Sequence, residues 1–277
     1  MSERRARPRL TASAKIGLAL LVVLVFVAMF PGLVTHISPD AIDITDRLRA
    51  PTSGHPLGTD NIGRDLLARL VYGARLSVLV AVISVTGAVL IGVTLGLVAG
   101  YYGRWADAVI MRVVDIFLAF PVILLALALV AVLGAGASSV MIALVLVFWT
   151  QYARVVRAAT LAEREKAHVE AARALGAGDL RILRQHILPN VISPVIILAT
   201  LGMGTAVVAE SALSFLGMGV QPPAPSWGWT LAFGTRYLRD APHIATFSGL
   251  AIMATVLGFN LLGDGIRDWL DPRFRPL

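Results

Sequence analysis

The 277-residue chain is 57% hydrophobic and only 15% charged, whereas soluble domains carry about 25% charged residues. This composition excludes an ordinary soluble protein and indicates an integral membrane protein. The net charge of +7 does not indicate nucleic-acid binding, because the Lys and Arg residues lie between apolar runs, as in the cytoplasmic loops of membrane proteins. The chain has no Cys, which excludes disulfides and cysteine-ligated metal sites.

Six apolar runs are each long enough to cross about 30 Å of hydrocarbon. They cover residues 16–34, 76–100, 113–133, 140–158, 191–213 and 244–262. The first run follows a basic tail, residues 1–15, and is longer than the core of a signal peptide, so we interpret it as an uncleaved span rather than a signal peptide. The sequence therefore predicts an all-α membrane protein with six transmembrane helices.

The connections divide the chain further. Residues 35–75 are a polar segment expected outside the cell, and apolar residues at helical spacing over 60–72 predict an amphipathic helix on the membrane surface. Residues 76–262 then form a core of five transmembrane helices, and residues 263–277 form a polar tail. Most Lys and Arg residues lie in the two tails and in a polar segment at 159–190, which predicts that these parts are cytoplasmic.

The polar segment at 159–190 has a helical pattern of its own. Good helix formers from Glu163 to Leu175 predict one helix, which Gly176 is expected to end in left-handed geometry. Asp179 is expected to cap a second helix that stops at Pro189. A solvated loop is the alternative interpretation.

Two alanines in this segment, Ala171 and Ala172, follow an isolated acid, Glu170. Their small side chains leave one helical face without bulk, so that another protein can approach closely. The pattern therefore favours a docking helix over a loop that only faces water.

Four motifs resemble one known family. Glu170-Ala171-Ala172, with Gly176 and Leu188-Pro189, resembles the EAA loop of the membrane-spanning subunits of ABC importers, although His186 stands where that family usually has isoleucine. Residues 55–65, 214–223 and 260–273 resemble the dipeptide, oligopeptide and nickel branch, and its C-type subunit. The resemblance implies the type I importer permease fold, and a coupling helix that contacts an ATPase through Glu170, Ala171, Ala172, Leu175, Gly176 and Asp179.

The resemblance also implies partners. They are a homologous second permease subunit, two cytoplasmic ATPase domains and an extracytoplasmic substrate-binding protein, in a bacterial or archaeal inner membrane. This chain has no phosphate loop of the Walker type, so ATP and magnesium are expected on the ATPase subunits and this chain is expected to be non-catalytic. A di- or oligopeptide is the expected substrate, and nickel is the alternative within the family.

Two acids lie in or beside the apolar runs, where an ionised carboxylate is costly and therefore a candidate for function. Asp115 is within a turn of Arg112 and is interpreted as a surface ion pair or a gating residue. Glu210, with Ser211 and Ser214, is interpreted either as part of the passage near its outer mouth or as a structural group.

Two other classes of protein remain as alternatives. A secondary transporter would show internal inverted repeats, and no convincing repeat is visible. A membrane-embedded enzyme would need a catalytic cluster within the spans, where only Asp115 and Glu210 are available. The five His residues are scattered, which argues against a metal site.

Overall fold

The computed structural model describes residues 11–270, and this part of the chain is helical, with turns and one isolated bridge between Thr59 and Asp65. The predicted all-α class is confirmed. The expected basic tail at 1–15 and polar tail at 263–277 lie partly outside the described residues. In chain order the elements are α1 (Ala12–Met29), α2 (Pro31–Val34), the 3-10 helix η1 (Ile44–Asp46), α3 (Leu66–Tyr102), α4 (Arg104–Leu118), α5 (Val122–Leu133), α6 (Ala137–Arg164), α7 (Ala167–Ala174), α8 (Asp179–Ile182), the π-helical turn η2 (Leu183–Ile187), α9 (Leu188–Phe215), α10 (Trp227–Arg236) and α11 (Pro242–Leu270).

The long helices match the predicted spans in five places. α1, α3, α6, α11 and the stretch from α8 to the end of α9 are each long and apolar enough to cross a membrane, and α4 with α5 forms a sixth candidate. The predicted single helix over 113–133 is wrong, because α4 and α5 meet at a bend of 92°. The bend falls at Pro121, which lacks a backbone N–H and disfavours helical geometry in Phe120.

The predicted amphipathic helix over 60–72 is also wrong in its extent. Asp65 caps α3 by accepting a hydrogen bond from the backbone N–H of Ala68 at 2.7 Å, so the helix begins at Leu66. It then continues for 37 residues to Tyr102, because the sequence contains no proline that would separate a surface helix from the span. Residues 47–65 before it form turns.

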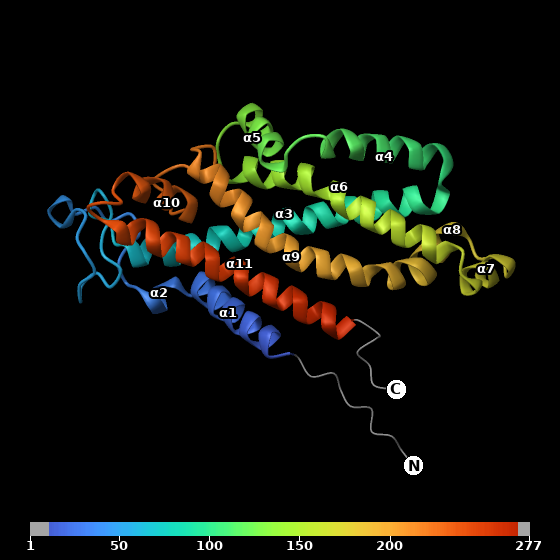
Figure 1. Ribbon diagram of the computed structural model, residues 1–277, viewed down its shortest axis with the longest axis horizontal. Coiled ribbons are helices and arrows are strands. Elements are labelled where there is room, and N and C mark those ends of the chain that lie inside the picture. The colour runs from blue at the N-terminus through green and yellow to red at the C-terminus, as the bar shows by residue number, and fades with distance from the viewer. Residues whose placement is uncertain (1–10, 271–277) are drawn as a thin grey trace, which may run out of the picture.

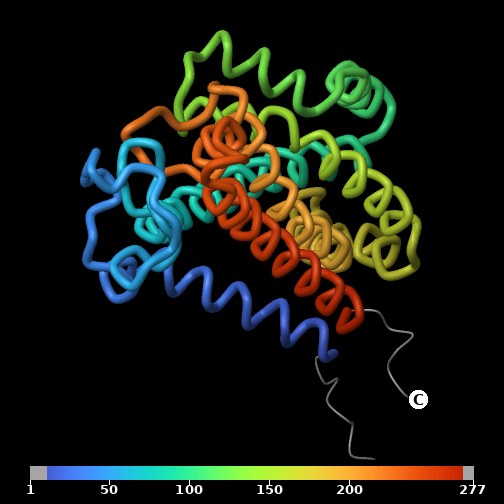
Figure 2. Tube along the Cα trace, turned by 60° about the vertical axis from the view of Figure 1, so that its left-hand side comes forward, coloured from blue at the N-terminus to red at the C-terminus, as the bar shows by residue number. Residues whose placement is uncertain are grey.

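The long helices lie along one axis of the molecule, with α3 packed against both α6 and α9 and with α1 beside α11 (Figures 1 and 2). Glycines of α3 allow the close contact with α6. A Cβ on Gly92 or Gly96 would lie 2.6 and 2.7 Å from backbone oxygens of α6. Small residues are the usual means of helix packing in lipid, where apolar burial provides no net attraction.

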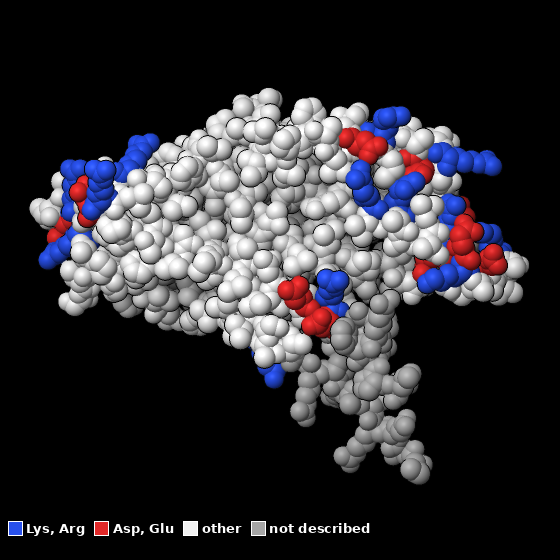
Figure 3. Space-filling model, in the orientation of Figure 1, with Lys and Arg blue, Asp and Glu red and all other residues white. Residues whose placement is uncertain are grey.

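Charged side chains concentrate toward the ends of the long helices, with a broad uncharged surface between them (Figure 3). One end carries α7 and α8, and the opposite end carries α10 and the loop before α3 (Figure 1). α11 runs from the α10 end toward the α7 end, where Gly265 packs against Ala14 of α1. The described parts nearest the two termini therefore lie on the same side of the uncharged belt.

Candidate functional site

The segment between α6 and α9 doubles back at one end of the molecule (Figure 1). The predicted helix from Glu163 to Leu175 is interrupted, because α6 ends at Arg164 and α7 begins at Ala167. The buried carboxylate of Glu163 lies 2.6 Å from Lys166 Nζ and 3.3 Å from His168 Nε2. These contacts draw the chain back toward α6 and favour a turn at this position.

The end of α7 has the geometry that the sequence predicts. Gly176 has a φ of +80°, its N–H donates to the carbonyl of Arg173, and the N–H of Ala177 donates to the carbonyl of Ala172, each at 3.0 Å. This pair of hydrogen bonds is the Schellman ending, which places a residue in the left-handed region. No atom lies within 4 Å of a Cβ built on Gly176, so the backbone angle, and not space, favours glycine.

Two expectations for the following helix are wrong. Asp179 does not cap α8, because Gly178 holds the N-cap position. The carboxylate of Asp179 instead accepts a hydrogen bond from Tyr101 Oη at 2.8 Å. The helix does not stop at Pro189 either. The chain widens into the π-helical turn η2 and enters α9, whose first turn contains Pro189. Pro189 therefore lies inside one continuous helix from Asp179 to Phe215, and the π-helical turn directly before it accommodates the missing proline N–H.

The two faces of α7 differ. Val169 is fully buried and Ala172 is only 8% exposed, so the expectation that both alanines lie on an open face is wrong for Ala172. The spacing of three residues places Val169 and Ala172 together on the inner face. The outer side consists of Glu170 and Ala171, and continues through Leu175, which is 89% exposed.

The outer side extends past the turn. Leu180 of α8 is 66% exposed, and the side chain of Glu170 makes no hydrogen bond or ion pair within residues 11–270. We call the exposed residues Glu170, Ala171, Leu175 and Leu180 the α7 surface. It combines an unpaired acid with two large apolar side chains on an otherwise polar end of the molecule.

A second cluster surrounds Glu210 in α9, near the α10 end. Its side chain is fully buried, as expected for an acid that avoids lipid. Its carboxylate accepts hydrogen bonds from the hydroxyl groups of Ser214 at 2.8 Å, Ser226 at 3.3 Å, Ser211 at 3.4 Å and Ser77 at 3.5 Å. The four donors come from α3, α9 and the residue that caps α10.

The Glu210 cluster holds the α10 end together. Ser226 is also the N-cap of α10, where it accepts a hydrogen bond from the backbone N–H of Trp229, and Ser214 accepts one from the N–H of Val220. Each serine thus links Glu210 to the segment that follows α9. The sequence indicates Ser211 and Ser214, but gives no signal for Ser77 or Ser226, because only the tertiary fold brings them to Glu210.

Asp115 lies on α4 with an exposed side chain. Its carboxylate accepts a hydrogen bond from Arg154 Nη2 of α6 at 2.8 Å. The expected surface ion pair is therefore present, but its partner is not Arg112 on the same helix. Nearby, Asp107 of α4 pairs with Arg157 of α6, so the two ion pairs connect the same helices.

Comparison with known proteins supports the fold and the family. The family model described as "Binding-protein-dependent transport system inner membrane component" matches residues 92–276. The dipeptide transport system permease protein DppC of Alkalihalophilus pseudofirmus is 46% identical over 262 residues, which are 95% of this chain and 86% of that protein.

Two further relatives have a similar sequence identity to this chain. The glutathione transport system permease protein GsiD of Pectobacterium atrosepticum is 41% identical over 98% of this chain and 90% of its own length. The di/tripeptide transport system permease protein DppC of Pseudomonas aeruginosa is 43% identical over 94% of this chain and 88% of its own length.

Solved structures show the same fold. A structure of the MetNI methionine ABC transporter in an inward-facing conformation matches with a TM-score of 0.59 and 22% identity, over 73% of this chain and 97% of that chain. At this identity the likeness shows the fold alone. The family is assigned from the family model and the sequence relatives. The chain belongs to the family of binding-protein-dependent transport system inner membrane components, the permease subunits of ABC transporters.

Proposed function

We propose that this chain is one permease subunit of an ATP-driven importer of di- or oligopeptides. The observation that carries the proposal is the 46% identity, over 95% of the chain, to a dipeptide transport system permease. The other two relatives are named for glutathione and di/tripeptide transport. These names favour a peptide over nickel, and the family assignment replaces the secondary-transporter and membrane-enzyme alternatives.

The α7 surface is the proposed docking site for an ATPase domain. Leu175 is 89% exposed, and covering such a side chain stabilises a complex by about 2 kcal/mol. Glu170 has no partner within residues 11–270, so it is free to pair with a basic group of the ATPase. Gly176 and Asp179 set the shape of this surface rather than its chemistry, through the turn and the bond to Tyr101.

The inner face of α7 supports a role in transmitting movement. Val169 and Ala172 are buried against the remainder of the chain, and α7 contacts both α6 and η2, which leads into α9. A displacement of α7 by an ATPase domain is therefore transferred to two membrane-spanning helices. Packed elements of this kind shift as units, because close-packed interiors resist gradual deformation.

The remaining parts of the assembly follow from the family. A homologous second permease subunit and two ATPase domains complete the proposed transporter, and an extracytoplasmic binding protein delivers the peptide. ATP and magnesium are proposed to bind the ATPase domains, and no metal or nucleic acid is proposed for this chain. The Lys and Arg residues around α7 favour a cytoplasmic position for that end in the inner membrane, with both termini on the same side.

Co-purification tests this proposal. A tagged chain is co-expressed with its second permease and ATPase subunits, and the recovered ATPase is measured for the unaltered chain and for Leu175→Asp. The variant is expected to lose the ATPase while it still inserts and retains the second permease. Leu238→Asp serves as the matched control, because Leu238 lies at the α10 end and is 53% exposed. Full recovery of the ATPase with Leu175→Asp contradicts the proposal.

A further inference from the structure

Tyr101, in the last turn of α3, connects this helix to the segment that carries the α7 surface. Its hydroxyl donates a hydrogen bond to the carboxylate of Asp179 in α8 at 2.8 Å, and the guanidinium of Arg173 in α7 lies near the same hydroxyl. Within residues 11–270, α3 contributes no other side chain to a hydrogen bond or ion pair with α7 or α8. Tyr101 is therefore the polar link between α3 and these two short helices.

The end of α3 that carries Tyr101 is held firmly against α6. Arg164, the last residue of α6, donates from Nη1 to the carbonyl oxygens of Gly100 at 2.8 Å and Tyr101 at 3.3 Å. The last carbonyls of a helix have no partner within it, so Arg164 satisfies two of them. A Cβ on Gly100 would lie 2.6 Å from the Cβ of Thr160, which shows how closely the two helices approach. A displacement of Asp179 therefore acts on a fixed helix end.

The link through Tyr101 differs in kind from the contacts that join α7 to α6 and α9. Those contacts are made by packing, because Val169 and Ala172 are buried and α7 contacts both α6 and η2. Packing between α3 and α7 or α8 is slight by comparison. The hydrogen bond of Tyr101 therefore adds α3 to the helices that a movement of α7 reaches.

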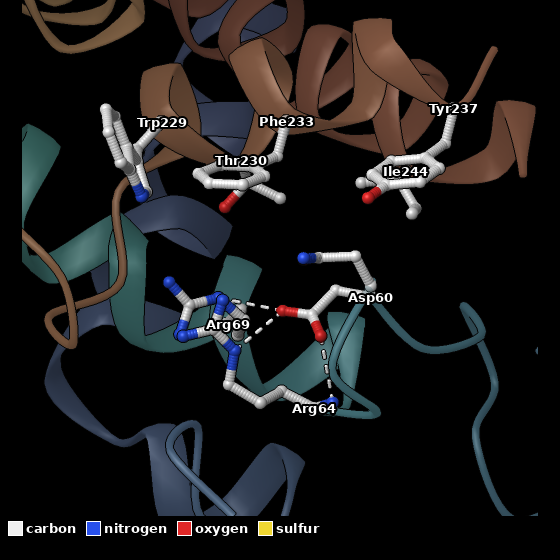
Figure 4. A pocket seen from close by; sticks show the side chains of 9 residues that line it. Asp60, Arg64, Arg69, Trp229, Thr230, Phe233, Tyr237 and Ile244 are labelled. Carbon is white, nitrogen blue, oxygen red and sulfur yellow. Dashed lines mark hydrogen bonds and ion pairs between the residues drawn. The ribbon is translucent and has the colours of Figure 1, made fainter. Parts of the chain in front are cut away.

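The opposite end of α3 is anchored at the α10 end. Arg69 is 1% exposed, and its Nη1 donates to the carbonyl oxygens of Pro39 at 3.2 Å and Pro223 at 3.4 Å. Figure 4 shows its guanidinium beside Asp60, opposite aromatic side chains of α10. Two turns further along, Ser77 donates to Glu210. One uninterrupted helix thus joins Tyr101 at the α7 end to polar contacts at the α10 end.

We propose that Tyr101 is a positioning residue for transport. Its hydrogen bond to Asp179 transfers the displacement of α7 and α8 by an ATPase domain to α3, and α3 carries the displacement to the α10 end. Packed helices shift as units, so a pull at one end is felt at the other. The proposal rests on the importer function proposed above, to which it adds a residue and a third membrane-spanning helix.

The peptide imported for each ATP hydrolysed tests the proposal. The whole transporter is placed in proteoliposomes with its binding protein and glycyl-leucine. Tyr101→Phe keeps the ring and removes only the hydroxyl, and it is expected to lower this ratio about fivefold, the effect of one lost hydrogen bond. The affinity for the ATPase and the unfolding midpoint should not change. A residue with only a structural role would lower the midpoint and leave the ratio intact.

A matched control and a double variant sharpen the experiment. Tyr102→Phe is the control, because Tyr102 is the next residue, is 51% exposed, and makes no side-chain hydrogen bond within residues 11–270; its ratio should not change. Asp179→Asn keeps an oxygen acceptor and should retain more of the ratio than Asp179→Ala. Tyr101→Phe combined with Asp179→Ala should be no worse than either alone, because both remove the same bond. Additive losses overturn the proposal.

A second measurement does not depend on the identity of the substrate. Amide hydrogen exchange over residues 66–80 of α3 is compared with and without a nonhydrolysable ATP analogue bound to the assembled transporter. The analogue is expected to change the exchange, and Tyr101→Phe is expected to reduce that change severalfold. An unchanged ratio or an unchanged nucleotide response in Tyr101→Phe overturns the proposal. If the response depends on Tyr101 while no glycyl-leucine is imported, the positioning role stands and the peptide assignment is wrong.

Discussion

The two ends of this permease satisfy their polar groups in different ways. At the α10 end, the buried carboxylate of Glu210 accepts hydrogen bonds from four serine hydroxyls of the same chain. At the α7 end, Glu170 has no partner within residues 11–270, and Leu175 is 89% exposed. The Glu210 cluster is complete by itself, whereas the α7 surface is suited to contact another protein.

This contrast separates stability from assembly. Changes in the Glu210 cluster are expected to lower the free energy of unfolding, because they leave buried groups unpaired. Changes in the α7 surface are expected to leave folding intact and weaken the complex, because those side chains are already exposed to solvent.

Glu210→Ala is expected to have the largest effect, a loss of about 3 kcal/mol in the free energy of unfolding, because it removes the common acceptor of several buried hydroxyls and leaves a cavity. The segment from Gly217 to Arg236 should become more accessible to protease, since Ser226 loses its link to α9. Denaturant unfolding in detergent and limited proteolysis measure these effects. An unchanged unfolding midpoint contradicts the structural role of the cluster.

Glu210→Gln is the companion variant, because it retains a carbonyl acceptor and the side-chain volume while it removes the charge. Its stability is expected to lie between those of the unaltered chain and Glu210→Ala. Transport in vesicles then decides whether the charge has a further role. Normal stability with lost transport would assign Glu210 to the passage or its gate, and normal transport would leave it structural.

Leu175→Asp is expected to weaken binding of the ATPase by about 2 kcal/mol, which is roughly thirtyfold in the dissociation constant. The unfolding midpoint of the isolated permease pair should not change, because Leu175 packs against little of its own chain. Titration of purified ATPase against the permease pair in nanodiscs measures the affinity. A lower unfolding midpoint with unchanged affinity would place Leu175 in the fold instead of the interface.

Gly176→Ala is expected to cost about 1 kcal/mol, because an L-residue is disfavoured at a φ of +80°. The effect should be local, with faster amide hydrogen exchange in α7 and α8 and reduced stimulation of the ATPase. Gly178→Ala is the control, since its φ is −69° and an open space surrounds it. Equal exchange in the two variants contradicts the argument from the backbone angle.

Asp115→Asn is expected to have the smallest effect, a loss of at most about 0.5 kcal/mol in the free energy of unfolding. The side chains of Asp115 and its partner Arg154 are both exposed, so solvent screens the ion pair. Thermal unfolding in detergent measures the change, and added salt should reduce it further. A loss of transport without a loss of stability would instead give Asp115 the gating role that remains the alternative.

Much of the fold could be predicted from the sequence, because apolar runs of about 20 residues leave few alternatives in a membrane. The bend between α4 and α5 is harder to predict, although Pro121 marks its position. A proline shows where a helix is weakened, but neighbouring contacts decide whether it bends or breaks. The same limit applies to Pro189, where a π-helical turn lets the chain continue into α9.

The sites were predictable only where the signal is local. Gly176 was identified from its position after helix formers, whereas the burial of Ala172 required attention to its spacing from Val169. Ser77 could not be assigned to the Glu210 cluster, because it lies 133 residues away in the sequence.

The most direct test of the account uses the absence of cysteine from this chain. Leu175→Cys and Leu238→Cys are each combined with a short bifunctional thiol–amine crosslinker in membranes that contain the whole transporter. The first variant is expected to form a covalent product with the ATPase subunit, and the second is not. A crosslink to the ATPase from position 238, or none from position 175 in a transporter that still imports peptide, would contradict the assignment of the α7 surface.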